Sequence, residues 1–91
     1  MKQIEELGKQ MSGVFHREYT AEASALQMQA INEGLAKLAM EITGIRADQL
    51  ADENLENKPI VRLYWTTLSQ LTQLMFLEAA RHQSYYREAD R

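Results

Sequence analysis

Residues 59–87 read PIVRLYWTTLSQLTQLMFLEAARHQSYYR, and this stretch decides how the rest of the chain packs. Apolar residues recur in it every three or four positions, which is the spacing of one face of an α-helix. That face consists of Val61, Tyr64, Leu68, Leu71 and Met75. A second apolar row lies beside it and consists of Ile60, Leu63, Leu74 and Leu77. A helix that is apolar on more than one side must be covered on more than one side, so the segment is predicted to be the central helix of a bundle.

The length and composition limit the class of protein. Ninety-one residues make a single domain, residues 1–91. The absence of cysteine excludes a disulfide framework and a thiolate zinc site. The N-terminus is charged and lacks the apolar core of a signal peptide, and no apolar run is long enough for a membrane span. We therefore expect a cytoplasmic protein that has no contact with a membrane.

The first helix is predicted over residues 2–17. Its apolar positions form one narrow stripe, made of Ile4, Leu7, Met11 and Val14. Gly8 and Gly13 each cost a helix roughly 0.5–1 kcal/mol, so this helix should be stable only when it is docked on the others. A packing helix is the main interpretation, and a mobile arm that engages a partner is the alternative.

The second helix is predicted over residues 20–43, after a break at residues 16–20. Thr20 is suited to the N-cap position, and Gly44 is placed where a helix is commonly ended by a left-handed glycine. The apolar stripe runs through Met28, Ile31, Leu35, Leu38 and Ile42. Gly34, in the middle of the helix, either admits the backbone of another helix or is merely tolerated.

Residues 45–58 form an acidic connector in which Leu50 and Leu55 suit a short helical turn. The connector is either a solvated loop or a negative patch that docks on a basic partner. Pro59 then fits the first position of the last helix, predicted over residues 59–87.

Together these elements predict an all-α fold of three helices. The second and third helices form an antiparallel hairpin, the first lies across it, and oligomerisation completes the bundle. The expected core consists of Leu35, Leu38, Ile42, Leu68, Leu71 and Met75. The last helix carries more apolar surface than this arrangement covers, which favours a homodimer or higher oligomer. Its interface is predicted to contain Tyr64, Trp65, Leu68, Leu71, Met75 and Phe76.

No arrangement of residues indicates catalysis. The chain has two histidines and no cysteine, and its adjacent carboxylates, such as Glu5 and Glu6, do not face each other on a helix. Glu78 and His82 are one turn apart, but two ligands on one helix do not make a metal site. We expect no enzymatic activity, no metal and no cofactor. The net charge of −3 and the dispersed basic residues argue against nucleic acid as a partner.

Four basic residues are candidates for binding an anion. His16 and Arg17 lie where the second helix starts, and helix N-termini attract anions. Arg62 and Arg81 lie on the last helix and are candidates to line a pocket between subunits. A polar helix end and a solvated helix face are the corresponding structural interpretations.

The helical hairpin, its polar connector and the Thr66-Thr67-Leu68 entry into an apolar helix resemble small phage proteins that sequester cyclic nucleotide signals as oligomers. The likeness covers the second half of the chain and implies no particular binding residue. The sequence thus favours a small oligomeric protein that acts by protein–protein contact, as an adaptor, inhibitor or chaperone. The alternative is a protein that sequesters a nucleotide or another anion between its subunits.

Overall fold

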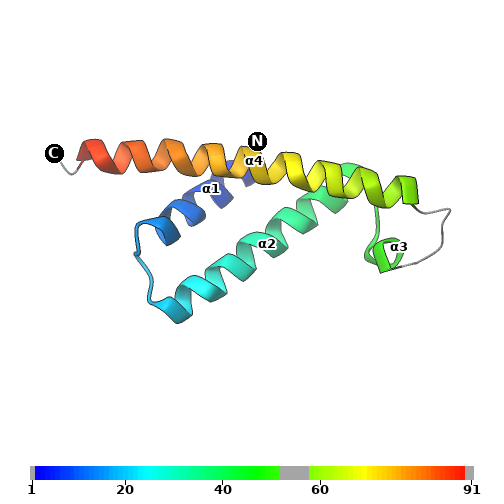
Figure 1. Cartoon of the computed structure of the whole chain (residues 1–91), viewed down its shortest axis with the longest axis horizontal. Coiled ribbons are helices and arrows are strands. Elements are labelled where there is room, and N and C mark those ends of the chain that lie inside the picture. Colours follow the sequence, from blue (N-terminus) through cyan, green and yellow to red (C-terminus); the bar gives the residue numbers. More distant parts are fainter. Residues whose placement is uncertain (1, 52–57, 90–91) are drawn as a thin grey trace.

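The computed structural model describes residues 2–51 and 58–89, with side chains up to His82, and the described part is helical without any strand (Figure 1). The helices are α1 (Lys2–Phe15), α2 (Ala21–Thr43), α3 (Ala47–Ala51) and α4 (Lys58–Ala89). The predicted all-α class is therefore confirmed. The three long helices end within two residues of their predicted bounds, and the short α3 falls on the turn suggested by Leu50.

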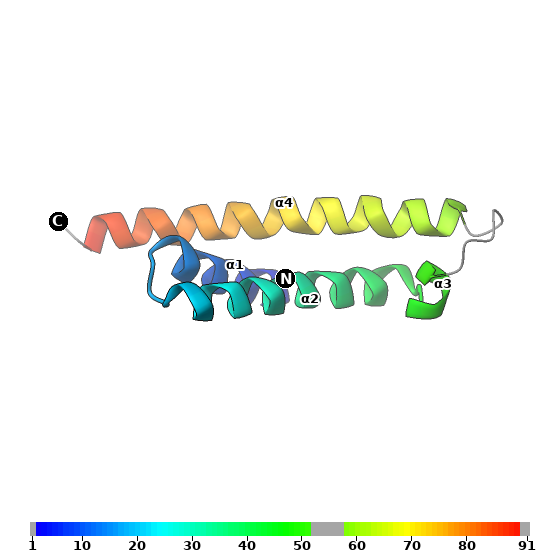
Figure 2. The same cartoon turned by 60° about the horizontal axis from the view of Figure 1, so that its bottom comes forward.

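The helices form two layers (Figure 2). One layer is α4 alone, which runs along the whole molecule, and the other is a V formed by α1 and α2 (Figures 1 and 2). The molecule measures 55 × 26 × 16 Å, so it is about two helices thick. The antiparallel pairing of α2 with α4 agrees with the predicted hairpin. The first helix does not lie across that hairpin, however, because α1 shares a layer with α2 and packs mainly against α4.

The docking of α1 depends on a close approach to α4. Ile4, Leu7 and Met11 are buried, so the packing interpretation of this helix is right and the mobile-arm alternative is wrong. A Cβ atom added at Gly8 would lie 2.5 Å from the Cβ of Glu78 and 3.2 Å from the backbone nitrogen of Ala79. Glycine at this position therefore allows the two helices to touch, which compensates for its low helix propensity.

The ends of α2 follow the predicted capping chemistry. The Ala23 backbone N–H donates a hydrogen bond to the Thr20 hydroxyl oxygen at 3.2 Å, as an N-cap requires. Gly44 has φ 72°, and its N–H donates to the Met40 carbonyl at 2.8 Å. That left-handed conformation is available to glycine at no steric cost, and it turns the chain towards α3.

The region after α2 supplies one core residue that the sequence pattern missed. Ile45 is buried although it lies in the predicted connector, and Leu50 of α3 is partly buried against the core. The Arg46 Nε donates to an Asp48 carboxylate oxygen at 3.0 Å on the surface beside them. This hydrogen bond lowers the pKa of Asp48 and raises that of Arg46. The acidic part of the connector that contains Leu55 lies outside the described residues.

The predicted core is right except at one position. Leu35, Leu38, Leu71 and Met75 are buried, and Leu68 is partly buried against them. The prediction for Ile42 is wrong, because half of its surface (50%) is exposed. Ile42 lies in the last turn of α2, past the point where α1 begins, so α1 does not cover it (Figure 1).

Candidate interaction surface

The middle of α4 is free of charge. No charged residue occurs between Arg62 and Glu78, although this segment forms the centre of the longest helix. One side of the segment faces α1 and α2 and is buried, as Tyr64, Leu71 and Met75 show. The rest of the segment has no residue suited to water except its serine, threonine and glutamine side chains. The composition therefore predicts that the uncovered sides are contact surfaces.

Large apolar side chains project from both uncovered flanks of this segment. The exposed side chains are Leu63, Trp65, Leu74, Phe76 and Leu77. Residues eleven positions apart share one direction on a helix, since eleven residues complete about three turns. Leu63 and Leu74 therefore lie on one flank, which we call the aliphatic flank, together with Leu77. Trp65 and Phe76 lie on the other, the aromatic flank.

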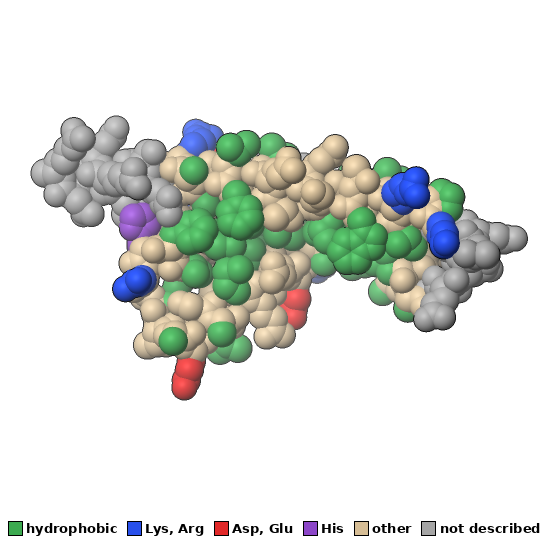
Figure 3. Space-filling view, viewed as in Figure 1, with side chains coloured by type: hydrophobic (Ala, Val, Ile, Leu, Met, Phe, Trp, Pro, Cys, Tyr) green, Lys and Arg blue, Asp and Glu red, His purple; other side chains and the backbone are tan. Residues whose placement is uncertain are grey.

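The aromatic flank is extended by a residue of α1. The Phe15 and Phe76 rings are stacked, with centroids 6.2 Å apart and planes at 20°. Trp65 meets the buried Tyr64 edge to face at 5.2 Å, but 58% of Trp65 remains exposed. Figure 3 shows hydrophobic side chains gathered along the boundary between α4 and the V of α1 and α2. Exposed aromatic side chains, tryptophan above all, are typical anchors of protein interfaces.

The aliphatic flank borders a groove of about 420 Å³ between α1 and α4. Its lining residues are Ile4, Glu5, Leu74, Leu77, Glu78 and Arg81. Arg81 Nη1 lies 3.0 Å from Glu78 Oε1, so the single cation of this groove is already paired. The groove offers an apolar floor beside a rim in which Glu5 leaves one net negative charge, so it suits an apolar side chain better than an anion.

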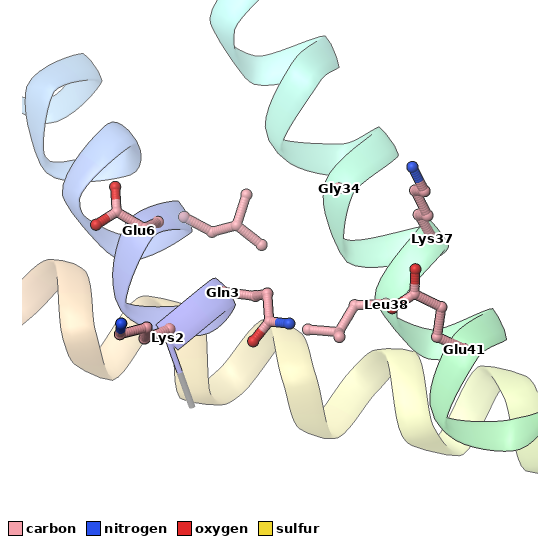
Figure 4. Close-up of a pocket in the computed structure, with 8 residues that line it drawn as sticks. Lys2, Gln3, Glu6, Gly34, Lys37, Leu38 and Glu41 are labelled. Atoms are coloured by element: carbon pink, nitrogen blue, oxygen red, sulfur yellow. The ribbon is translucent and has the colours of Figure 1, made fainter.

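A second groove, of about 440 Å³, lies between α1 and α2 (Figure 4). Lys2 and Glu6 come from α1, and Lys37 and Glu41 come from α2, so its charges balance. Gly34 lies in its wall, and a Cβ atom there would lie 3.0 Å from Leu7 Cδ2. The neighbour of Gly34 is therefore a side chain, and the interpretation that it admits a helix backbone is wrong.

The four candidate anion ligands do not converge within one chain. His16 and Arg17 are exposed in the turn between α1 and α2, where Arg17 has φ 55°. Arg62 and Arg81 are exposed on α4 nineteen positions apart, which corresponds to about 28 Å along a helix. Any pocket that uses both arginines therefore requires a second copy of the chain.

The predicted oligomer interface is divided between surface and interior. Trp65 and Phe76 are exposed as expected, and Leu68 is partly buried. Tyr64, Leu71 and Met75 lie in the chain's own core, so they are not available to another molecule. Sequence reasoning placed the main stripe at the interface, whereas α1 and α2 already cover it. The second apolar row, which contains Leu63, Leu74 and Leu77, is the one left open.

Other kinds of site receive no support from the described residues. Among them, no three histidine, aspartate or glutamate side chains are grouped as ligands of a metal ion. In the same part of the chain, no helix combines the length and apolar character of a membrane span. The chain matches no protein-family model, no curated protein and no solved structure.

Proposed function

We propose that this protein is a small helical protein that self-associates through α4 and acts by binding other proteins, as an adaptor, inhibitor or chaperone. The observation that carries the proposal is the charge-free segment of α4, which exposes large apolar side chains on both flanks. Soluble monomers rarely leave large apolar patches uncovered in water.

The total surface supports the same proposal. The chain exposes 6706 Å², whereas a compact monomer of this size is expected to expose roughly 5,400 Å². The outline of the molecule is elongated, and α4 extends past the turn between α1 and α2 (Figure 2). Covering apolar surface yields about 25 cal/mol per Å², so association of the exposed flanks is favourable.

Among the described residues, the ionisable groups with clear pKa shifts lie on the surface. Active sites usually place such groups in a cavity, where burial and neighbouring charges tune them. Here the clear pKa shifts belong to Arg46 and Asp48, whose side chains are each 71% exposed on the surface near α3. Their shifts arise from one surface ion pair, which needs no catalytic explanation.

Light scattering coupled to size-exclusion chromatography tests the self-association over a range of concentrations. We expect a mass of at least two chains at micromolar concentration. Leu74→Glu should lower that mass to one chain, because the charge would have to be buried at the interface. Gln73→Glu is the matched control, since it adds the same charge one position away on the back of α4 and should leave the mass unchanged. A wild-type mass of one chain at every concentration would refute the proposal.

The alternative function is binding of a nucleotide or another anion in a pocket between subunits. It is favoured only by the exposed arginines of α4, which a single chain cannot bring together. A thermal-shift screen with nucleotides separates the two proposals. A true ligand at one hundred times its dissociation constant stabilises the fold by about 2.7 kcal/mol, and the shift should vanish in Arg62→Gln and Arg81→Gln.

A further inference from the structure

We propose that a second copy of this chain binds along the aliphatic flank of α4, so that the two α4 helices pair antiparallel about a twofold axis. The proposal rests on the proposed function, because it specifies which surface self-associates. The occupant is inferred from three properties of that flank: its spacing, its polarity pattern and its charges.

The spacing of the flank is that of a coiled-coil seam. Positions alternate by three and four residues, which is the heptad pattern by which one helix packs against another. We call these positions the open seam: Ile60, Leu63, Thr67, Gln70, Leu74 and Leu77. The seam lies next to the stripe that α1 and α2 cover. One helix thus has two adjacent packing seams, and its own chain fills one of them.

The open seam is available for contact. Four of its residues are exposed: Leu63, Gln70, Leu74 and Leu77. The other two, Ile60 and Thr67, are partly buried. From Ile60 to Leu77 the seam extends for about 25 Å along the helix. The groove lined by Leu74 and Leu77 lies beside it, so a helix seated on the seam also covers that groove.

The polarity pattern selects a register. When Leu63 of one copy lies opposite Leu74 of the other, Ile60 lies opposite Leu77 and Thr67 lies opposite Gln70. The twofold axis repeats each pair, giving six layers in which apolar residues meet apolar residues and the two polar residues meet each other. Polar residues at a few seam positions commonly fix register and orientation, because a shifted helix would bury them against leucine.

The charges favour the antiparallel orientation over a parallel one. A parallel pair in register would place Arg81 against Arg81 at the next seam position and would align the two helix dipoles unfavourably. In the antiparallel register the two Arg81 residues lie at opposite ends of the paired helices, so they do not face each other.

The open seam offers four exposed side chains on each copy, and the groove lined by Leu74 and Leu77 adjoins it. A stable interface buries about 1,200–2,000 Å² in total, which sets the size that the dimer has to reach. The aromatic flank, with Trp65 and Phe76, points away from the open seam and stays uncovered in this dimer.

Cysteine crosslinking tests the register, because the chain contains no cysteine of its own. Leu63→Cys and Leu74→Cys are prepared as separate single variants, and circular dichroism checks that each is folded. Each variant is oxidised alone, and an equal mixture of the two is oxidised in parallel. The proposed register predicts a covalent dimer in the mixture and little in either variant alone, because equivalent residues lie about 16 Å apart along the paired helices. Thr67→Cys with Gln70→Cys should behave in the same way at the centre of the seam.

Trp65→Cys with Thr72→Cys is the matched control. These positions come level in the same register but lie on the opposite flank, so their mixture should not crosslink. Emission of the single tryptophan gives a second readout and should not change as the dimer forms.

Crosslinking of Leu63→Cys with itself, or of the control pair, would overturn the proposed seam. A dimeric mass without crosslinks in either seam mixture would also overturn the proposed seam, although the proposal of self-association would still hold. A monomeric mass at every concentration would instead overturn the proposed function itself.

Discussion

The two stripes of α4 differ little in sequence and strongly in environment. Leu71 and Met75 are buried beneath α1 and α2, whereas Leu74 and Leu77, on the neighbouring stripe, lie largely in water. Both stripes are helically spaced and free of charge between Arg62 and Glu78, but Thr67 and Gln70 interrupt the apolar run of the open seam. The stripe that α1 and α2 cover is therefore the one without polar residues.

The docking position of α1 is fixed by small residues. Gly8 allows α1 to approach Ala79 and Glu78 at the edge of the core stripe, and Ala79 is fully buried at that contact. Once α1 is held there, the open seam has no further element of the described chain to cover it. The helix α4 has two seams, and α1 and α2 cover one of them. The open seam is therefore available to another molecule.

The largest expected contrast is between alanine substitutions on the two stripes. Leu71→Ala should lower the free energy of unfolding by about 2–5 kcal/mol, because it leaves a cavity in the core. Leu74→Ala, measured at a dilution where the chain is monomeric, should change it by less than about 1 kcal/mol. Chemical denaturation followed by circular dichroism gives both values. Equal losses for the two variants would mean that the stripes do not differ as described.

A second contrast concerns the two glycines that contact neighbouring helices. Gly8→Ala should destabilise the fold by roughly 1–3 kcal/mol, reduced by up to about 1 kcal/mol of gained helix propensity. The Cβ atom would collide with the Cβ of Glu78, which cannot move without moving α4. Gly34→Ala should be neutral or stabilising, because its neighbour is the flexible end of Leu7. Thermal melts of both variants decide the matter, and a stabilising Gly8→Ala would show that α1 and α4 are not in close contact there.

A smaller effect is expected at Ser12. Its hydroxyl oxygen is buried with no hydrogen-bond partner among the described residues. Ser12→Ala should therefore stabilise the fold by about 1 kcal/mol or more, since an unpaired buried hydroxyl is costly. Ser69→Ala, on the exposed face of α4, is the matched control and reports only the gain in helix propensity, about 0.5 kcal/mol. If the two variants gained equally, the Ser12 hydroxyl would have to be satisfied in solution.

The smallest effect concerns the surface pair near α3. The hydrogen bond from Arg46 lowers the pKa of Asp48, so this pair contributes stability above the ordinary pKa of aspartate. The contribution is lost as the pH falls through the lowered pKa, and solvent screening keeps it small. An NMR titration of the Asp48 carboxyl carbon should give a midpoint below that of a free aspartate. In Arg46→Gln the midpoint should rise towards the ordinary value, and an unchanged midpoint would contradict the pairing.

Local chemistry made the helix ends predictable from the sequence. Thr20 and Gly44 cap α2 through contacts within a few residues, and such contacts depend on residue type more than on the fold. The same holds for the helical spacing that identified both stripes of α4.

Tertiary placement limited the rest of the prediction. Ile42 continues the α2 stripe but lies past the start of α1, and Ile45 follows no helical pattern yet is buried. Tyr64 was assigned to the interface because the sequence does not say which stripe of α4 the chain covers itself. Gly8 looked like a weakness of the first helix, whereas in the structure it permits the contact that covers the core stripe.

The most direct test of the account compares the two stripes within one sample, by methyl NMR with a soluble paramagnetic agent. In dilute solution, the Leu74 methyl groups should be relaxed as strongly as those of Leu26, an exposed residue on α2, while those of Leu71 should be protected. Raising the protein concentration should protect Leu74 and leave Leu26 and Leu71 unchanged. A Leu74 signal that is protected at every dilution, or that remains exposed at every concentration, would contradict the claim that a second copy covers the open seam of α4.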